Sequence, residues 1–166
     1  MLPPYANALA PPGYLAIVRT REDQMATARD IMTGGVECAQ VDETLADAAR
    51  KMRDLDVGAL PICGEDNRLK GMITDRDIVV KCIAEGGDPS SVKVSELAEG
   101  KPVTVGADDP VEEVLRTMTQ YGVRRLPVID GHDLVGMVSQ ADVATNLPDG
   151  MTAQLVESIS AKPANN

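Results

Sequence analysis

The chain has 166 residues, of which 43% are hydrophobic, and a formal net charge of -10. This size suits one compact domain or two very small ones and excludes a large multi-domain enzyme. The acidic balance opposes broad attraction to nucleic acid or anionic lipid, and an aromatic content of 2%, with no Phe or Trp, argues against base-stacking surfaces.

Residues 1–24 are expected to form an appended N-terminal arm. Pro3, Pro4, Pro11 and Pro12 interrupt helix and strand patterns there, and Met25 would itself serve as a start. This stretch has no early positive charge, and no apolar run in the chain approaches the roughly 20 residues that span a bilayer. We therefore expect neither a signal peptide nor a membrane anchor, and a cytoplasmic location.

The chain then contains an internal repeat with an offset of about 66 residues. Apolar residues at helical spacing predict amphipathic helices over 45–55 in the first copy and 111–121 in the second. A short strand is predicted before each helix, over 36–41 and 102–107, and a matched strand after it, over 57–62 and 123–128. Each copy therefore begins as a β-α-β unit.

Each copy continues with a turn, the second arm of a hairpin and a second helix that starts near Thr74 or Ser139. The predicted fold class is α/β (α+β), with β-α-β-β-α repeats over 25–84 and 93–147 and a linker rich in Gly, Pro and Ser over 85–92. One repeat is too small for an adequate core, so the two should pack together with pseudo-two-fold symmetry. In the tail, 148–166, Leu155, Val156 and Ile159 at helical spacing predict a short packing helix.

The pattern L-P-(I/V), a turn, then G-h-h-(T/S)-x-x-D occurs twice, with h an apolar residue. Over roughly residues 27–147 this arrangement resembles the cystathionine β-synthase (CBS) domain pair, or Bateman module. Segments 27–32, 60–64 and 74–78 resemble the small stand-alone CBS-pair proteins of actinobacteria. The resemblance implies a regulatory homodimer that is not an enzyme and that binds AMP, ADP, ATP or S-adenosylmethionine between its paired sheets.

The resemblance also implies roles for particular side chains. An aspartate near the start of each second helix would accept hydrogen bonds from ribose hydroxyls, and the Thr or Ser three residues earlier would face a phosphate, beside the amide donors of the helix N-terminus. Arginines would pair with phosphate through their planar guanidinium groups. The candidate nucleotide-binding residues are Thr74, Arg76, Asp77, Arg124, Arg125, Ser139 and Asp142.

Two alternatives stay open for these residues. The T/S-x-x-D spacing also matches a helix N-terminal cap, in which the side chains serve the helix rather than a ligand. The repeats also differ, because Arg124 and Arg125 stand where the first copy has Gly58 and Ala59, and Arg76 has an alanine as its counterpart. We expect one competent and one degenerate cleft; the alternative is a ligand-free, stress-related dimeric scaffold for an unknown protein partner, with a response to redox conditions as a further hypothesis.

The cysteines and the single histidine give weaker indications. Cys38 and Cys63 lie on strands that a β-α-β unit can place side by side, so a disulfide is geometrically feasible; the alternative is two reduced residues in the core, as expected for Cys82. His132 stands alone in a polar turn and the chain has no CxxC pair, so no metal site is predicted. No nucleophile motif or P-loop is present, so no catalytic residue is assigned.

Overall fold

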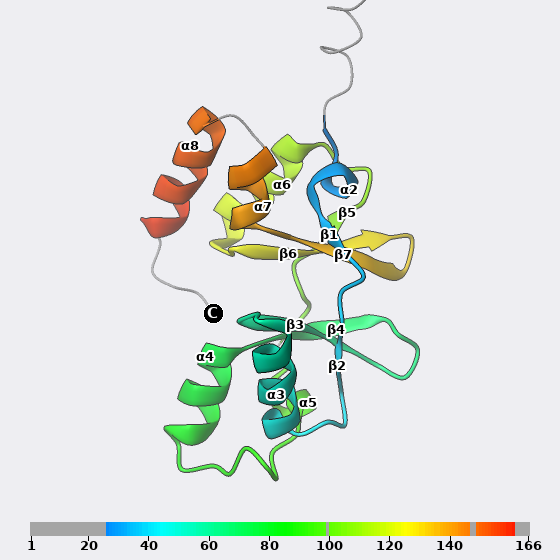
Figure 1. Ribbon diagram of the computed structural model, residues 1–166, viewed down its shortest axis with the longest axis vertical. Helices are drawn as coiled ribbons and strands as arrows, with labels where there is room; N and C mark the ends of the chain where they lie inside the picture. The colour runs from blue at the N-terminus through cyan, green and yellow to red at the C-terminus, as the bar shows by residue number, and fades with distance from the viewer. Residues whose placement is uncertain (1–25, 99, 147–148, 162–166) are drawn as a thin grey trace, which may run out of the picture.

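The computed structural model describes residues 26–98, 100–146 and 149–161 (Figure 1). The predicted N-terminal arm lies outside the described residues. In chain order, the elements are α2 (Ala28–Ile31), β1 (Thr33–Gly34), β2 (Ala39–Gln40), α3 (Leu45–Leu55), β3 (Ala59–Cys63), β4 (Leu69–Thr74), α4 (Asp75–Asp77), the π-helix η1 (Ile78–Ile83), α5 (Val94–Leu97), β5 (Val105–Gly106), α6 (Val111–Tyr121), β6 (Arg125–Asp130), β7 (Asp133–Ser139), α7 (Gln140–Asn146) and α8 (Asp149–Ser160).

The two long amphipathic helices begin and end where their sequences predict. Thr44 caps α3 by accepting from the backbone N–H of Asp47, and the Asp47 carboxylate accepts from Thr44 in return. Helix α6 follows Pro110 and ends at Gly122, whose φ of 66° is the left-handed conformation that terminates a helix. Both repeats have the β-α-β-β-α order, so the predicted mixed α and β fold class is confirmed.

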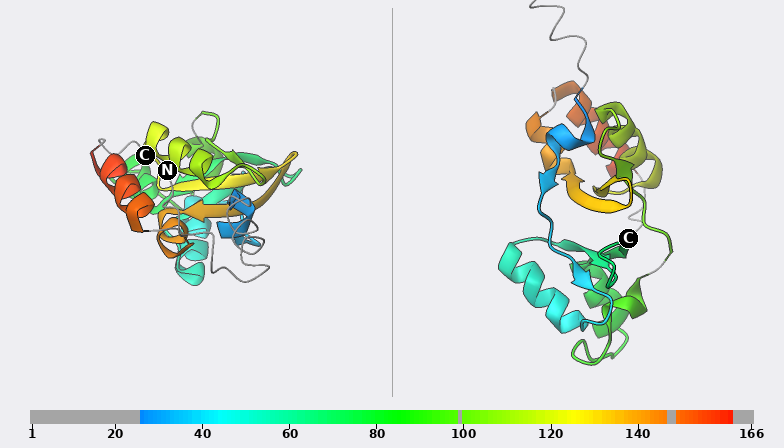
Figure 2. Two further views of the ribbon diagram at one scale, coloured as in Figure 1. Left: turned by 90° about the horizontal axis from the view of Figure 1, so that it is seen from above. Right: turned by 90° about the vertical axis from the view of Figure 1, so that its right-hand side faces the viewer.

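The strands form two sheets that lie face to face, with the helices on the two outer sides (Figures 1 and 2). The three-stranded sheet has the order β2-β3-β4 and the four-stranded sheet the order β1-β7-β6-β5. In each sheet an antiparallel hairpin, β3–β4 or β6–β7, is joined by one parallel strand, β2 or β5. The side chains of Leu126 and Val128 on β6 are buried in the core with α6.

The structure differs from the sequence prediction at the start of each repeat. The strands predicted over 36–41 and 102–107 are reduced to two residues each, β2 and β5, because the flanking residues carry the chain between the sheets. The short helices α2 and α5 were not predicted; each has four residues, too few to show a helical period. The second helix of the first repeat starts as α4 and continues as the π-helix η1.

Helices α2 and α5 each pack against the other repeat. Helix α2 opens the first repeat in sequence but packs against the second, and α5 opens the second but packs against the first. The amide of Ala28 in α2 donates to the carbonyl of Asp109 at 2.9 Å, and the amide of Val94 in α5 donates to the carbonyl of Glu43 at 2.8 Å. Ala28 and Ile31 are buried in the core of the second repeat, and Val94 in that of the first. The two repeats thus exchange their first helices, and the packing units cross the boundaries predicted along the chain.

Helix α8 supplies the helix predicted in the tail. It packs beside α6 and α7 on the outer side of the second repeat (Figure 1). Val156 in this helix remains partly exposed. Within the described ranges, no helix has both the length and the apolar character that crossing a membrane would require.

Candidate functional site

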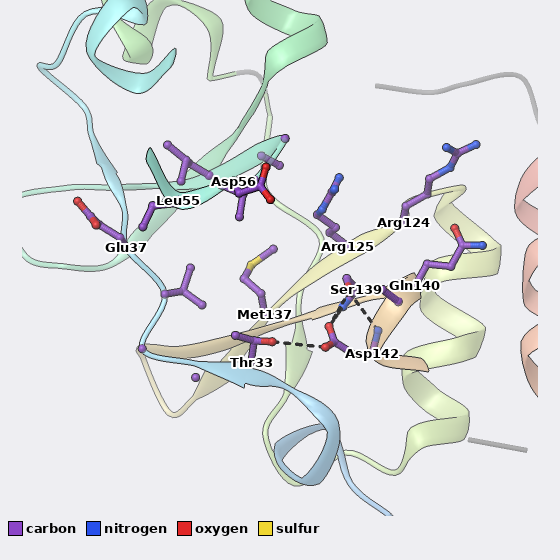
Figure 3. A pocket seen from close by; sticks show the side chains of 18 of the residues that line it. Thr33, Glu37, Leu55, Asp56, Arg124, Arg125, Met137, Ser139, Gln140 and Asp142 are labelled. Carbon is purple, nitrogen blue, oxygen red and sulfur yellow. Dashed lines mark hydrogen bonds between the residues drawn. The ribbon is translucent and has the colours of Figure 1, made fainter. Parts of the chain in front are cut away.

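A cleft of about 860 Å³ lies between the two repeats (Figure 3). This volume falls within the usual range for sites that hold a ligand of nucleotide size. Four segments form its walls: the crossing segment that runs through β1 towards β2, the end of α3 with the start of β3, the start of β6, and the end of β7 with the start of α7. The lining residues are Thr33 to Glu37, Leu55 to Leu60, Arg124, Arg125, Met137, Ser139 to Asp142 and Ala144.

The pairing of β6 with β7 gathers the polar side chains of the second repeat. Arg125 lies directly opposite Ser139 in the antiparallel register, so their side chains share one face of the sheet. The amide of Gln140 donates to the carbonyl of Arg124 at 2.9 Å, which fixes Arg124 beside the start of α7. Neither guanidinium group makes an ion pair or a hydrogen bond with another described residue. Two positive charges are therefore available to a ligand.

Ser139 and Asp142 bind each other at the start of α7. Oδ2 of Asp142 accepts from the Ser139 amide at 2.7 Å and from Ser139 Oγ at 2.6 Å, and the amide of Asp142 donates to Ser139 Oγ at 3.2 Å. This is the capping geometry that was the alternative to a binding role. The other oxygen, Oδ1, accepts only a long bond of 3.4 Å from Thr33 Oγ1 (Figure 3). One carboxylate oxygen thus serves the helix, and the other faces the cleft.

The walls of the cleft are largely aliphatic. Met137 points into the space between the sheets in Figure 3, and Leu55 lies on the opposite side. Leu55 and Val57 are 43% and 40% exposed, unusually high for large aliphatic side chains, and both line the cleft. Tyr121 is exposed at the end of α6 and does not line the cleft. A flat heterocycle in this cleft would lie between aliphatic side chains.

Two carboxylates from the first repeat also line the cleft. Asp56 ends α3 with a φ of 54°, where the second repeat has Gly122 in the same left-handed conformation. Asp tolerates this conformation better than most residues other than glycine, and here it brings a carboxylate to the mouth of the cleft. Glu37 lies 3.9 Å from the ammonium group of Lys51. The cleft therefore offers both signs of charge.

The matching motif of the first repeat lies outside this cleft. Oδ2 of Asp77 accepts from the amide of Thr74 at 3.0 Å and from its Oγ1 at 2.6 Å, and Oδ1 lies 3.1 Å from Lys81 Nζ. Burial alone would raise the pKa of Asp77, but the hydrogen bonds from Thr74 and Lys81 outweigh it and hold the pKa below its ordinary value. Both oxygens of Asp77 thus face partners within the protein, Oδ2 through hydrogen bonds and Oδ1 through an ion pair. Arg76 also lies outside the cleft lining.

The cysteines are arranged differently from the reduced core residues that were one expectation. A disulfide joins Cys38 and Cys63, with an S–S distance of 2.03 Å, and Cys82 is a free thiol buried in the first core. Among the described residues, no three or more His, Cys, Asp or Glu side chains come together in a group that could hold a metal ion. The disulfide lies immediately after the crossing segment that lines the cleft.

The structure thus brings four of the seven sequence-predicted residues into one cleft and leaves three elsewhere. Arg124, Arg125, Ser139 and Asp142 come together. The sequence did not indicate the crossing segment or the end of α3, because these belong to the first repeat and reach the second only through the exchange of the first helices. Asp56 aligns with Gly122 in the repeat and has the same left-handed conformation. This match was a signal in the sequence that could have indicated the end of α3 as part of the site.

A comparison with known families assigns two copies of one domain to this chain. The profile described as "CBS domain" matches residues 28–83 and 94–149. These ranges coincide with the two repeats and include the exchanged helices α2 and α5.

Comparisons with individual proteins agree with this family match. Hypoxic response protein 1 of Mycobacterium tuberculosis is 49% identical over 140 residues, which cover 84% of this chain and 98% of that protein. A crystal structure of Hypoxic Response Protein I with two coordinated zinc ions has a TM-score of 0.69 at 52% identity, and covers 74% of this chain and 100% of that one. The CBS domain pair of protein MJ0100, in complex with 5'-methylthioadenosine and S-adenosyl-L-methionine, has a TM-score of 0.66 at 26% identity, with 74% and 95% covered. The predicted resemblance to small actinobacterial pairs is confirmed.

Proposed function

Because this chain belongs to the CBS domain family, we propose that it is a regulatory module that binds an adenosine-containing ligand in the cleft between its repeats. The observation that carries the proposal is the meeting of Ser139 and Asp142 with two arginines whose guanidinium groups have no partner among the described residues. The MJ0100 domain pair, which holds two adenosine derivatives, supports this ligand class. AMP, ADP, ATP and S-adenosylmethionine are the candidates.

The chemistry of the cleft supports a division of roles. Oδ1 of Asp142 accepts from a ribose hydroxyl, in place of its long bond with Thr33. Arg124 and Arg125 pair with the phosphate or carboxylate of the ligand, and adenine packs against aliphatic walls that include Val57 and Met137. No residue is given a catalytic role. Binding would act by favouring one conformation or partner surface over another.

The experiment is a thermal-shift titration with the four candidate ligands. Ligand at about 100 times its dissociation constant stabilises the fold by about 2.7 kcal/mol, which raises Tm on the order of 5 to 10 °C for a chain of this size. Asp142→Ala should abolish this rise. Asp77→Ala is the matched control, because both variants lose the same type of helix cap and only Asp142 lines the cleft. No shift with any ligand at millimolar concentration, or loss in the Asp77 variant alone, would contradict the proposal.

A ligand-free dimeric scaffold is the second candidate, and one surface favours it. Val79, Val80 and Ile83 on η1 are 54%, 44% and 51% exposed, next to one another on the outer side of the first repeat. The corresponding helix of the second repeat, α7, is partly covered by α8. A second copy of the chain would cover this surface. Sedimentation velocity of the ligand-free protein should give a dimer that Val79→Asp dissociates; a monomer would reject the scaffold.

A further inference from the structure

One segment, residues 33–38, connects the two repeats and forms a wall of the cleft. Thr33 and Gly34 in β1 pair with β7 of the second repeat, and Ala39 and Gln40 in β2 pair with β3 of the first. All five residues from Thr33 to Glu37 line the cleft. The position of this wall therefore depends on how firmly each end of the segment is held.

The upstream end is held by many contacts. Met32 and Thr33 lie so close to Gly136 that a Cβ there would come within 2.8 Å of the Thr33 carbonyl oxygen. Helix α2, immediately before the segment, donates backbone hydrogen bonds from Ala28 and Arg29 to the second repeat, each of 2.9 Å. This end is thus fixed to the sheet that carries Ser139 and Arg125.

The downstream end is held by fewer contacts, and one of them is a covalent bond. Residues 35–38 make no backbone-to-backbone hydrogen bond with the described part of the chain, and β2 beyond them has only two residues. Cys38 is held by its disulfide to Cys63 at the end of β3 and by one hydrogen bond, from Lys51 Nζ to the Cys38 carbonyl at 3.0 Å. Without the disulfide, these four consecutive residues would be held only by two contacts with Lys51: the hydrogen bond to the Cys38 carbonyl and the 3.9 Å ion pair with Glu37.

We propose that the Cys38–Cys63 disulfide is a redox site that controls the order of this wall and, through it, the affinity of the cleft for its ligand. The control of affinity rests on the proposed function. With the disulfide formed, the wall is ordered before the ligand binds. With the disulfide reduced, the ligand must order it, and each residue ordered on binding lowers affinity by a factor on the order of ten. In the cytoplasm predicted from the sequence, disulfides are usually transient and redox-sensing.

The burial of the two cysteines indicates how the exchange proceeds. Cys63 is 0% exposed, whereas Cys38 is half-buried, so the thiolate of a dithiol reductant reaches the Cys38 sulfur first. The disulfide breaks, the reductant is bound to Cys38 as a mixed disulfide, and Cys63 leaves as a thiolate and takes up a proton. The second thiol of the reductant then releases Cys38. Two electrons and two protons have passed to the protein, and the reductant has become a disulfide.

The test uses the full chain and two independent measurements. Amide ¹⁵N relaxation without ligand should show backbone order parameters of residues 35–38 falling to about 0.6 or lower after reduction with dithiothreitol, while those of α6 are unchanged. Calorimetric titration with AMP and with S-adenosylmethionine should show affinity about tenfold or more weaker in the reduced protein. The double variant Cys38→Ser with Cys63→Ser should behave as the reduced protein in both conditions. Cys82→Ala, the control, should respond to reduction as the wild type does.

The possible outcomes distinguish the redox proposal from the proposed function, on which it partly rests. Lower order parameters of residues 35–38 after reduction, with no ligand bound in either state, support redox control of the wall and overturn the proposed function. Ligand binding with equal affinity and equal order parameters in both states overturns the redox site and leaves the proposed function standing. A disulfide that resists excess dithiothreitol in the folded protein also overturns the redox site.

Discussion

At the level of single residues, Asp77 and Asp142 occupy matching positions but differ in one neighbour. In the first repeat Lys81 lies one helical turn after Asp77, and its Nζ is 3.1 Å from Oδ1, the Asp77 oxygen that does not cap the helix. The residue in the same place in the second repeat is Asn146, whose side-chain amide donates to the Asp142 backbone carbonyl instead. The Asp142 carboxylate thus keeps an oxygen for the cleft, and the binding role proposed for Asp142 but not for Asp77 rests on this difference between Asn146 and Lys81.

Asp77 should make stability depend on pH in the acid range. Its pKa is lowered in the fold from an ordinary 3.8, so folding favours the carboxylate. This contribution is present above about pH 4 and is lost as pH falls through the lowered folded-state pKa. In urea unfolding at pH 6, Asp77→Asn should lower the free energy of unfolding by about 1.5 to 3 kcal/mol, because a charged acceptor of hydrogen bonds is lost.

The difference between wild type and Asp77→Asn should shrink as the pH is lowered towards 3. Glu85→Gln is the control, since Glu85 is exposed in a turn and should leave the free energy of unfolding nearly unchanged across this range. A constant difference between wild type and Asp77→Asn from pH 6 to pH 3 would show that the Asp77 charge does not contribute to stability.

At the level of elements, the exchanged helices explain the glycine in each G-h-h-(T/S)-x-x-D motif. Gly136 in β7 lies under the chain that leaves α2: an added Cβ would meet Met32 Sδ at 2.5 Å and the Thr33 carbonyl oxygen at 2.8 Å. Gly71 in β4 lies under the end of α5, where the nearest atom, Ala98 Cβ, would be at 3.3 Å. The absence of a side chain allows the exchanged segment to approach, and the approach is closer in the second repeat.

Gly136→Ala should therefore destabilise the fold more than Gly71→Ala. The Met32 side chain can move aside, but the Thr33 carbonyl belongs to the backbone that forms the cleft wall, so β1 must shift. Overpacking of this type costs about 1 to 3 kcal/mol, which chemical denaturation would detect. Gly71→Ala is the matched control, since both glycines occupy the same place in the motif. Equal effects of the two substitutions would mean that the close approach at Gly136 is not a constraint.

At the level of the whole molecule, the sequence predicted each repeat better than the contacts between repeats. The periodicity of residues 45–55 and 111–121 identified the helices, and the repeated motif gave two similar halves. The exchange of α2 and α5 depends on contacts such as that between Ala28 and Asp109, which lie far apart in sequence and leave no periodic signal. The candidate site was predictable to the same extent: the polar residues of the second repeat were found, and the walls contributed by the first were not.

The exchange also predicts how the molecule unfolds. Each core contains a helix from the other repeat, so neither core is complete if the other is lost. Scanning calorimetry should therefore give one transition, with a calorimetric enthalpy equal to the van't Hoff enthalpy. Leu60→Ala in the first core and Leu126→Ala in the second, where both side chains are nearly fully buried, should each lower the free energy of unfolding by about 2 to 5 kcal/mol and shift this same transition. Two separable transitions, each moved by only one of the substitutions, would mean that the repeats fold independently and that the exchanged helices contribute little.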